Sequence, residues 1–190
     1  MAEQSMSDTV TNEQVITHMP SKRATLRHHL IFWPLGIIGV ALDLWSKQAV
    51  FARLDAHEEM PIIPGFMRFI LALNDGAAFS IASGQQYLLV AISSVALVVV
   101  IGVFMFGRGH SMLMTISLGL FAGGISGNLW DRAFNNGLVR DFIDVYVGQH
   151  HWPTFNVADS VLCIAVGLMM IATLTAPTDP PHRERDPQPK

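Results

Sequence analysis

The chain has few charged residues and almost no cysteine. Charged side chains make up 14% of its 190 residues, whereas a soluble domain usually carries about 25%. The single cysteine, Cys163, excludes an intrachain disulfide. The sequence also lacks an H-E-x-x-H motif, a G-x-S-x-G elbow and any basic cluster. The low charge indicates a membrane protein rather than a soluble domain, and the sequence gives no support to a zinc peptidase of that type, to a serine or cysteine nucleophile, or to nucleic-acid binding.

Four of the eight histidines occur as adjacent pairs, at His28–His29 and His150–His151. Neighbouring side chains on a strand or helix rarely converge on one ion, so the pairs do not indicate a metal site. We expect no metal and no other cofactor.

Long apolar runs dominate what is present, and hydrophobic residues make up 51% of the chain. Four runs, residues 30–51, 87–106, 112–130 and 157–176, each come near the ~20 residues that cross ~30 Å of hydrocarbon. The first run is too long for a cleaved signal peptide and lacks a small-residue cleavage site. We predict an all-α membrane protein with four transmembrane helices.

The distribution of Lys and Arg predicts the orientation. Four crossings put both termini on one side, and the positive-inside rule assigns the side richer in Lys and Arg to the cytoplasm. Segments 1–29 and 177–190 are polar or proline-rich, so we expect cytoplasmic, disordered tails around a domain of residues 30–176. Seven positive residues lie on the side of the termini, against four on the other: Lys22, Arg23, Arg27, Arg108, Arg183, Arg185 and Lys190, against Arg53, Arg68, Arg132 and Arg140.

Two further patterns concern the shape of the domain. Within the long loop 52–86, residues 62–71 are typical of short strands interrupted by a turn, which predicts a small extracytoplasmic β element. The short connection 107–111 predicts a helical hairpin. Gly119, Gly123 and Gly127 recur every four residues in the third span, which is typical of close helix packing; we expect this to hold the third span against the fourth.

Asp159 is the first candidate for chemistry, because an ionisable group at membrane depth is costly. The start of a helix favours its anion, whereas desolvation and a neighbouring carboxylate oppose it. Asn156 is the expected N-cap and would orient Asp159. Asp141 and Asp144 lie just upstream; if that segment is extended they point to opposite faces, and spacing alone does not choose between them. Two such acids sharing a proton could activate water.

Other polar residues have structural interpretations beside functional ones. Asp43 and Lys47 are spaced i, i+4, which favours a buried ion pair over a proton relay. Asp131 at the end of the third span is expected to be a structural ion pair or interfacial anchor, while Arg132 could hold a backbone carbonyl or a substrate in place. Residues 74–79 form a turn followed by small residues, either a plain turn or a wall against small side chains. Cys163 is expected to be a small packing residue.

Taken together, the segments over residues 30–176 resemble the bacterial lipoprotein signal peptidases, or signal peptidase II. Any one block is weak, but all five in order, with four spans, are highly specific. The blocks are Asp43-Leu44-Trp45-Ser46-Lys47, Asn74-Asp75-Gly76-Ala77-Ala78-Phe79, Gly127-Asn128-Leu129-Trp130-Asp131-Arg132, Val139-Arg140-Asp141-Phe142-Ile143-Asp144 and Phe155-Asn156-Val157-Ala158-Asp159.

The resemblance implies an intramembrane aspartic endopeptidase of the bacterial inner membrane. Such an enzyme removes the signal peptide from diacylglyceryl-modified prolipoproteins, just before the lipidated cysteine, at the extracytoplasmic face. It implies four helices with a small β cradle. Separately, we expect the chain to be a monomer, with the glycine face used within the bundle. The family's residues correspond to catalytic Asp141 and Asp159, which selects Asp141 over Asp144; to supporting Asn74, Asn128, Arg132 and Asn156; and to Asp43 and Lys47 as a structural pair.

One position departs from the family pattern. Arg140 stands where the family commonly has an apolar residue, and an inward-turned positive charge beside Asp141 would lower its pKa. In an extended segment we expect Arg140 to point away from Asp141.

Two rival functions fit less well. A carrier using Asp43, Lys47 and Asp159 needs polar groups through the bilayer midplane, where the second and third spans offer only Ser93, Ser94, Thr115 and Ser117. A non-catalytic scaffold gives no reason for the cluster of acids and asparagines.

Overall fold

The structure is a computed structural model that describes residues 24–76, 82–107 and 111–175. The predictions made for tail segments 1–23 and 176–190, for the small residues 77–79 and for most of the turn 107–111 lie outside the described residues.

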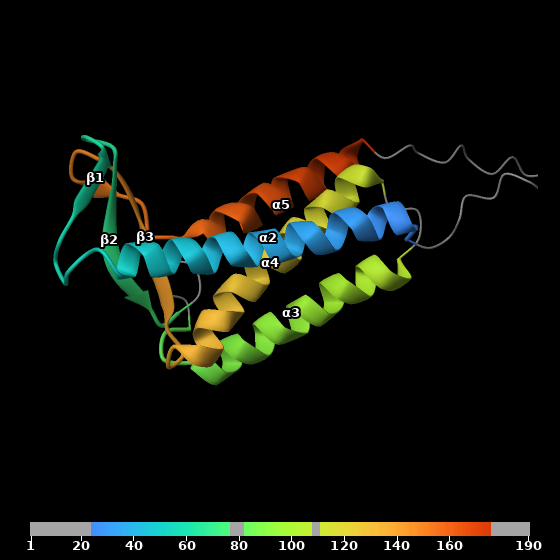
Figure 1. Ribbon diagram of the computed structural model, residues 1–190, viewed down its shortest axis with the longest axis horizontal. Coiled ribbons are helices and arrows are strands. Elements are labelled where there is room, and N and C mark those ends of the chain that lie inside the picture. The colour runs from blue at the N-terminus through green and yellow to red at the C-terminus, as the bar shows by residue number, and fades with distance from the viewer. Residues whose placement is uncertain (1–23, 77–81, 108–110, 176–190) are drawn as a thin grey trace, which may run out of the picture.

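Four helices form the body of the molecule: α2 (Leu26–Phe51), α3 (Gln86–Phe106), α4 (Met112–Phe134) and α5 (Val157–Leu174). All four are long and apolar enough to cross a membrane, which confirms the predicted four spans. Helix α2 begins at Leu26, inside the segment expected to be disordered, because Thr25 and His28 form a capping box there. The start of α2 and the end of α5 lie at one end of the bundle, opposite the strands (Figure 1).

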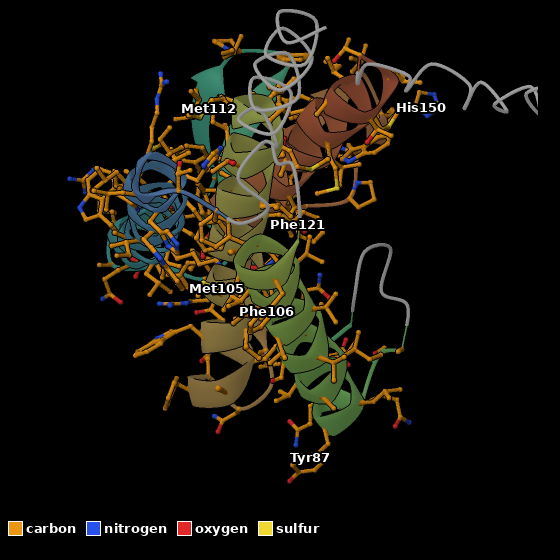
Figure 2. All side chains as sticks on the ribbon, turned by 90° about the vertical axis from the view of Figure 1, so that its right-hand side faces the viewer. Tyr87, Met105, Phe106, Met112, Phe121 and His150 are labelled. Atoms are coloured by element: carbon orange, nitrogen blue, oxygen red, sulfur yellow. The ribbon has the colours of Figure 1, made fainter. Side chains whose placement is uncertain are left out.

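Helix α4 is the centre of the bundle. In the apolar part of α4, 56% of the residues are buried, against 17% in the apolar part of each of the other three helices. It packs against α2, α3 and α5, whereas α3 packs chiefly on α4. Figure 2 shows α3 set apart from α2 and α5, with Tyr87 and Phe106 at its two ends. The outer faces of α2, α3 and α5 expose aliphatic side chains, such as Ile37, Val98 and Ile164, as a lipid-facing surface requires.

The glycines of α4 pack helices together, but mostly not the pair that was expected. A Cβ on Gly119 would lie 2.9 Å from the carbonyl oxygen of Phe32, and Gly123 lies equally close to the backbone of α2. Gly127 faces the side chain of Asp43, which is also on α2. The predicted glycine face therefore packs the third span against the first, and only the neighbouring Gly124 approaches α5.

A four-stranded antiparallel sheet covers the end of the bundle where α5 begins (Figure 1). Its strands, in the order β1-β2-β3-β4, are Met60–Ile63, Met67–Asn74, Val139–Val147 and His150–His151. Strands β1 and β2 confirm the β element predicted within residues 62–71. Strand β3 carries Asp141 and Asp144, and its Ile143 bridges to Phe155 just before α5. The sheet therefore brings β3 against the first turn of α5.

Candidate active site

Asp141 is a buried carboxylate on β3, with 1% of its surface exposed. It pairs with Ala72 of β2, which places Asn74 within reach at the end of that strand. Its Oδ2 accepts a hydrogen bond from Asn74 Nδ2 at 3.0 Å, and its Oδ1 accepts one from Asn156 Nδ2 at 2.6 Å. Burial, with a smaller contribution from the negative charge of Asp159, raises the pKa of Asp141 to about 6, although both amides oppose the rise.

Asp159 stands in the first turn of α5 and is held by the helix cap. Asn156 Oδ1 accepts from the Asp159 backbone N–H at 3.1 Å, and Asp159 Oδ2 accepts from the Asn156 N–H at 3.1 Å. This reciprocal capping box confirms Asn156 as the N-cap. The other oxygen, Oδ1, accepts from Asn128 Nδ2 at 2.8 Å. Both oxygens of Asp159 are thus fixed by N–H donors.

Two asparagine amides connect the acids. Asn156 Nδ2 donates both to Asp141 Oδ1 and, at 3.0 Å, to Asn128 Oδ1. Asn128 in turn donates to Asp159. The structure therefore brings Asp141 and Asp159 into one hydrogen-bonded group, built from β3, α4 and α5.

Lys47 fixes the orientation of this group from α2. Its ammonium donates to Asp43 Oδ2 at 2.7 Å and to Asn128 Oδ1 at 2.9 Å, and lies 3.3 Å from Asp131 Oδ2. An ammonium can only donate, so Asn128 must present its oxygen to Lys47 and its NH₂ to Asp159. Asp43 Oδ1 accepts from the backbone N–H of Ala158 at 2.9 Å. The predicted Asp43–Lys47 pair is confirmed, and it also contacts the first turn of α5.

Asp144 belongs to a different cluster. Arg68 Nε donates to Asp144 Oδ2 at 2.6 Å, and His151 Nδ1 lies 2.9 Å from its Oδ1. Burial alone would raise the pKa of Asp144, but the hydrogen bonds from His151 and Arg68 outweigh it and hold that pKa below its usual value. The extended strand thus separates the two acids that spacing left open, and Asp141 is the one beside Asp159.

The residues at the end of α4 divide between two roles. Asp131 forms the expected ion pair, but with Arg140, whose Nη2 lies 2.7 Å from Asp131 Oδ1, and with Lys47. Arg140 is therefore turned away from Asp141, as predicted. Arg132 donates from Nη2 to the carbonyl of Gly76 at 3.0 Å. Its Nε is buried and has no hydrogen-bond partner among the described residues.

These groups open onto one cavity of about 700 Å³, within the usual range for ligand sites. No group of three His, Cys, Asp or Glu within the described parts of the chain is arranged to hold a metal ion. The polar lining includes five of the predicted site residues, Asn74, Asn128, Arg132, Asp141 and Asp159. The predicted supporting residues that do not line the cavity, Asp43, Lys47 and Asn156, lie directly behind it, with no exposed surface.

The amino-acid sequence matches the family described as signal peptidase (SPase) II over residues 35–175. The chain belongs to the signal peptidase II family. A lipoprotein signal peptidase of Photorhabdus laumondii is 41% identical over 149 residues, which cover 76% of this chain and 88% of the relative. One of Syntrophotalea carbinolica is 38% identical over 136 residues, 70% of this chain and 84% of the relative.

Solved structures agree in fold. A bacterial membrane enzyme solved by the in meso method at 2.3 Å resolution has a TM-score of 0.71 at 30% identity, and covers 83% of this chain and 93% of that one. A second, solved at 1.9 Å, has a TM-score of 0.69 at 30% identity, and covers 83% and 99%. This signal peptidase II family member is therefore a multi-pass membrane peptidase.

Part of the cavity wall of this peptidase was missed from the sequence. Cys163, expected to be a packing residue, is exposed and lines the cavity four residues after Asp159. That i, i+4 spacing could have placed both side chains on one face of α5. Leu162 and the segment from Trp152 to Phe155 also line the cavity. No spacing rule indicates the latter, because the segment joins the sheet to α5 without regular structure over most of its length.

Proposed function

We propose that this chain is an intramembrane aspartic endopeptidase that removes signal peptides from diacylglyceryl-modified prolipoproteins, cutting just before the lipidated cysteine. The observation that carries the proposal is the pair of carboxylates, Asp141 and Asp159, on one cavity and joined through the amides of Asn128 and Asn156. The names of the relatives support the substrate class.

The environments of the two acids favour different roles. The pKa of Asp141 is raised to about 6, so it is the group that keeps a proton. Each carboxyl oxygen has two lone pairs, so a proton on Asp141 can face the cavity while Asn74 and Asn156 still donate to the same oxygens. Asp159 accepts N–H donors at both oxygens, from Asn128 Nδ2 and from the Asn156 backbone, and stands in the first turn of α5, so we assign it the role of the base.

The reaction then adds water across the scissile amide. Asp159 takes a proton from the water while its oxygen attacks the carbonyl carbon, and Asp141 donates its proton to the carbonyl oxygen. This forms a neutral tetrahedral diol. Asp159 next gives its proton to the amide nitrogen, the C–N bond breaks, and Asp141 recovers a proton from the diol as the new carboxyl group forms. Both acids end in their starting states.

The cavity offers the other contacts that such a substrate needs. Arg132 extends its guanidinium along the wall, and its Nε, which has no hydrogen-bond partner within the described parts of the chain, can donate to a backbone carbonyl of the signal peptide. Leu73 and Leu162 supply apolar lining for a lipidated residue. Asp159 lies in the first turn of a spanning helix, at the rim of the hydrocarbon. With the Lys and Arg bias, we place this rim on the extracytoplasmic side of the bacterial inner membrane, with both termini in the cytoplasm.

The test is cleavage of a diacylated prolipoprotein peptide by purified variants. Asp141→Asn and Asp159→Asn should each abolish cleavage while the protein still inserts and purifies normally. Asp144→Asn, measured per folded molecule, is the matched control and should keep the wild-type rate because it lies in the separate cluster with Arg68. Wild-type cleavage by either dyad variant would refute the mechanism.

The same peptide without its lipid tests the substrate. We expect cleavage of the lipidated peptide to be strongly preferred, because the apolar wall of the cavity would be left empty by the lipid-free form. Equal rates for both peptides would refute the assignment of the substrate class.

A further inference from the structure

Arg140 joins three of the elements that build the site. It lies on β3, one residue before Asp141, and its guanidinium grips Asp131 of α4: Nη2 lies 2.7 Å from Oδ1, and Nε lies 3.2 and 3.3 Å from the two oxygens. Its backbone N–H donates to Asp131 Oδ2 at 3.0 Å, and Nη1 reaches Gln48 Oε1 of α2 at 3.4 Å. The side chain thus ties the strand that carries Asp141 to both α4 and α2.

Arg140 shares Asp131 with Lys47. Of the three contacts of the Lys47 ammonium, that to Asp131 is the longest, at 3.3 Å, against 2.7 Å to Asp43 and 2.9 Å to Asn128. Asp131 meanwhile has its shortest ionic contact with Arg140. Because Arg140 takes most of the charge pairing of Asp131, the Lys47 ammonium bonds mainly to Asp43 and Asn128.

The four charges of this cluster balance. Asp43 and Asp131 carry two negative charges, and Lys47 and Arg140 carry two positive ones. The first three side chains have no exposed surface, and that of Arg140 is 19% exposed. A carboxylate that loses its partner in such a place is strongly unfavourable, so the balance depends on both cations.

We propose that Arg140 is a positioning residue for peptide cleavage: by neutralising Asp131 it keeps the Lys47 ammonium on Asn128, and so keeps the Asn128 amide directed at Asp159. The proposal rests on the proposed function, because Asp159 matters here as a member of the catalytic pair. It assigns a role to a residue that points away from the cavity.

Loss of the guanidinium has two consequences. Two buried carboxylates then compete for one ammonium, which draws Lys47 toward Asp131 and weakens its bond to Asn128. The uncompensated negative charge also raises the pKa of Asp141 further. The other charged groups around Asp141 are Asp43 and Lys47 on α2, Asp75 after β2, Asp131 and Arg132 on α4, and Asp159 on α5.

The experiment compares kcat and kcat/KM across pH for full-length enzyme acting on the diacylated peptide. Arg140→Met should lower kcat roughly tenfold, the effect of weakening one hydrogen bond to a charged group. It should also move the alkaline limb of the profile upward by about half a pH unit or more, since Asp141 keeps its proton longer. Arg140→Lys retains the charge and should keep the limb in place.

A second change in the same chain separates charge balance from folding. Asp131→Asn combined with Arg140→Met leaves Asp43 and Lys47 as a neutral pair, so the limb should return to its wild-type position. If Arg140→Met does not fold, Arg140→Gln, which keeps an N–H donor without the charge, should show the same shift.

The outcomes distinguish this proposal from the proposed function. A wild-type enzyme that does not cleave the lipidated peptide refutes the function itself. An active wild type whose Arg140→Met or Arg140→Gln variant keeps both kcat and the limb refutes the role of Arg140. A shift that Asp131→Asn fails to reverse refutes the charge-balance argument, because a merely structural loss would not depend on Asp131.

Discussion

Replacement of Gly127 by alanine should damage the site from behind, through a residue that carries no chemistry. A Cβ on Gly127 would collide with the Asp43 carboxylate. That side chain cannot simply swing away, because Lys47 and the Ala158 N–H hold its two oxygens. Overpacking of this kind costs about 1–3 kcal/mol. Moving Asp43 also moves Lys47, and with it the orientation of Asn128.

We therefore expect Gly127→Ala to lower both stability and catalysis. A displaced Asn128 amide that misses Asp159 by a fraction of an ångström should reduce kcat by about 10- to 100-fold, since each tenfold loss corresponds to about 1.4 kcal/mol. The assay is kcat on a diacylated peptide, normalised to folded enzyme, together with the melting temperature in the same detergent.

Two other glycines provide matched controls. Gly119→Ala collides with the backbone at Phe32, 2.9 Å away, and should lose similar stability while keeping kcat within about twofold, because this part of α4 lies outside the site. A Cβ on Gly102 meets nothing within 4 Å, so Gly102→Ala should be neutral or stabilise by up to about 1 kcal/mol. If Gly127→Ala melts like Gly119→Ala but cleaves at the wild-type rate, the reasoning about Asp43 is wrong.

Three further predictions concern pH, the sheet and the cavity wall. Because burial raises the pKa of Asp141 to about 6 and the proposed mechanism needs its proton, kcat/KM should fall as pH rises through an apparent pKa near 6; a flat profile from pH 5 to 8 would contradict the assigned roles. Asp144→Asn should lower the free energy of unfolding by roughly 1–3 kcal/mol through loss of the bonds with Arg68 and His151. Since the folded-state pKa of Asp144 is depressed, that stabilisation is present above about pH 4 and is lost on further acidification, so melting curves of variant and wild type should converge there. A bilayer-permeable maleimide should label Cys163, the single cysteine, and block cleavage. The Cys163→Ser variant should cleave at the same rate with and without the reagent.

Much of the fold follows from the sequence because a bilayer leaves few choices. Runs of about 20 apolar residues satisfy their backbone groups in hydrocarbon only as helices, so the four spans and most of their bounds were predictable. The strand Val139–Val147 was less predictable from the sequence. It contains Arg140, Asp141 and Asp144, and these charged side chains can be buried on its two faces only because residues of other elements pair with them. Residue spacing left the choice between the two acids open, and only the family resemblance and then the strand geometry made it.

The ion pairs show the same division. Asp43 and Lys47 lie one turn apart on one helix, so their contact could be read from spacing alone. Asp131 was expected to pair, but its partner Arg140 lies nine residues away, across a turn where Asn136 and Gly137 have φ values of 53° and 82°. The path of that turn determines which positively charged side chain reaches Asp131, and the local spacing of residues does not predict that path. The glycine face could likewise be recognised as a packing surface without showing which helix it meets.

The bond between the Asp43 carboxylate and the Ala158 N–H spans 115 positions of the chain. During synthesis Asp43 and Lys47 emerge first, and Asn156 and Asp159 emerge last, with the final helix. Under the proposed mechanism the carboxylate pair is complete only once that helix has docked, so we expect cleavage activity to begin only with this docking.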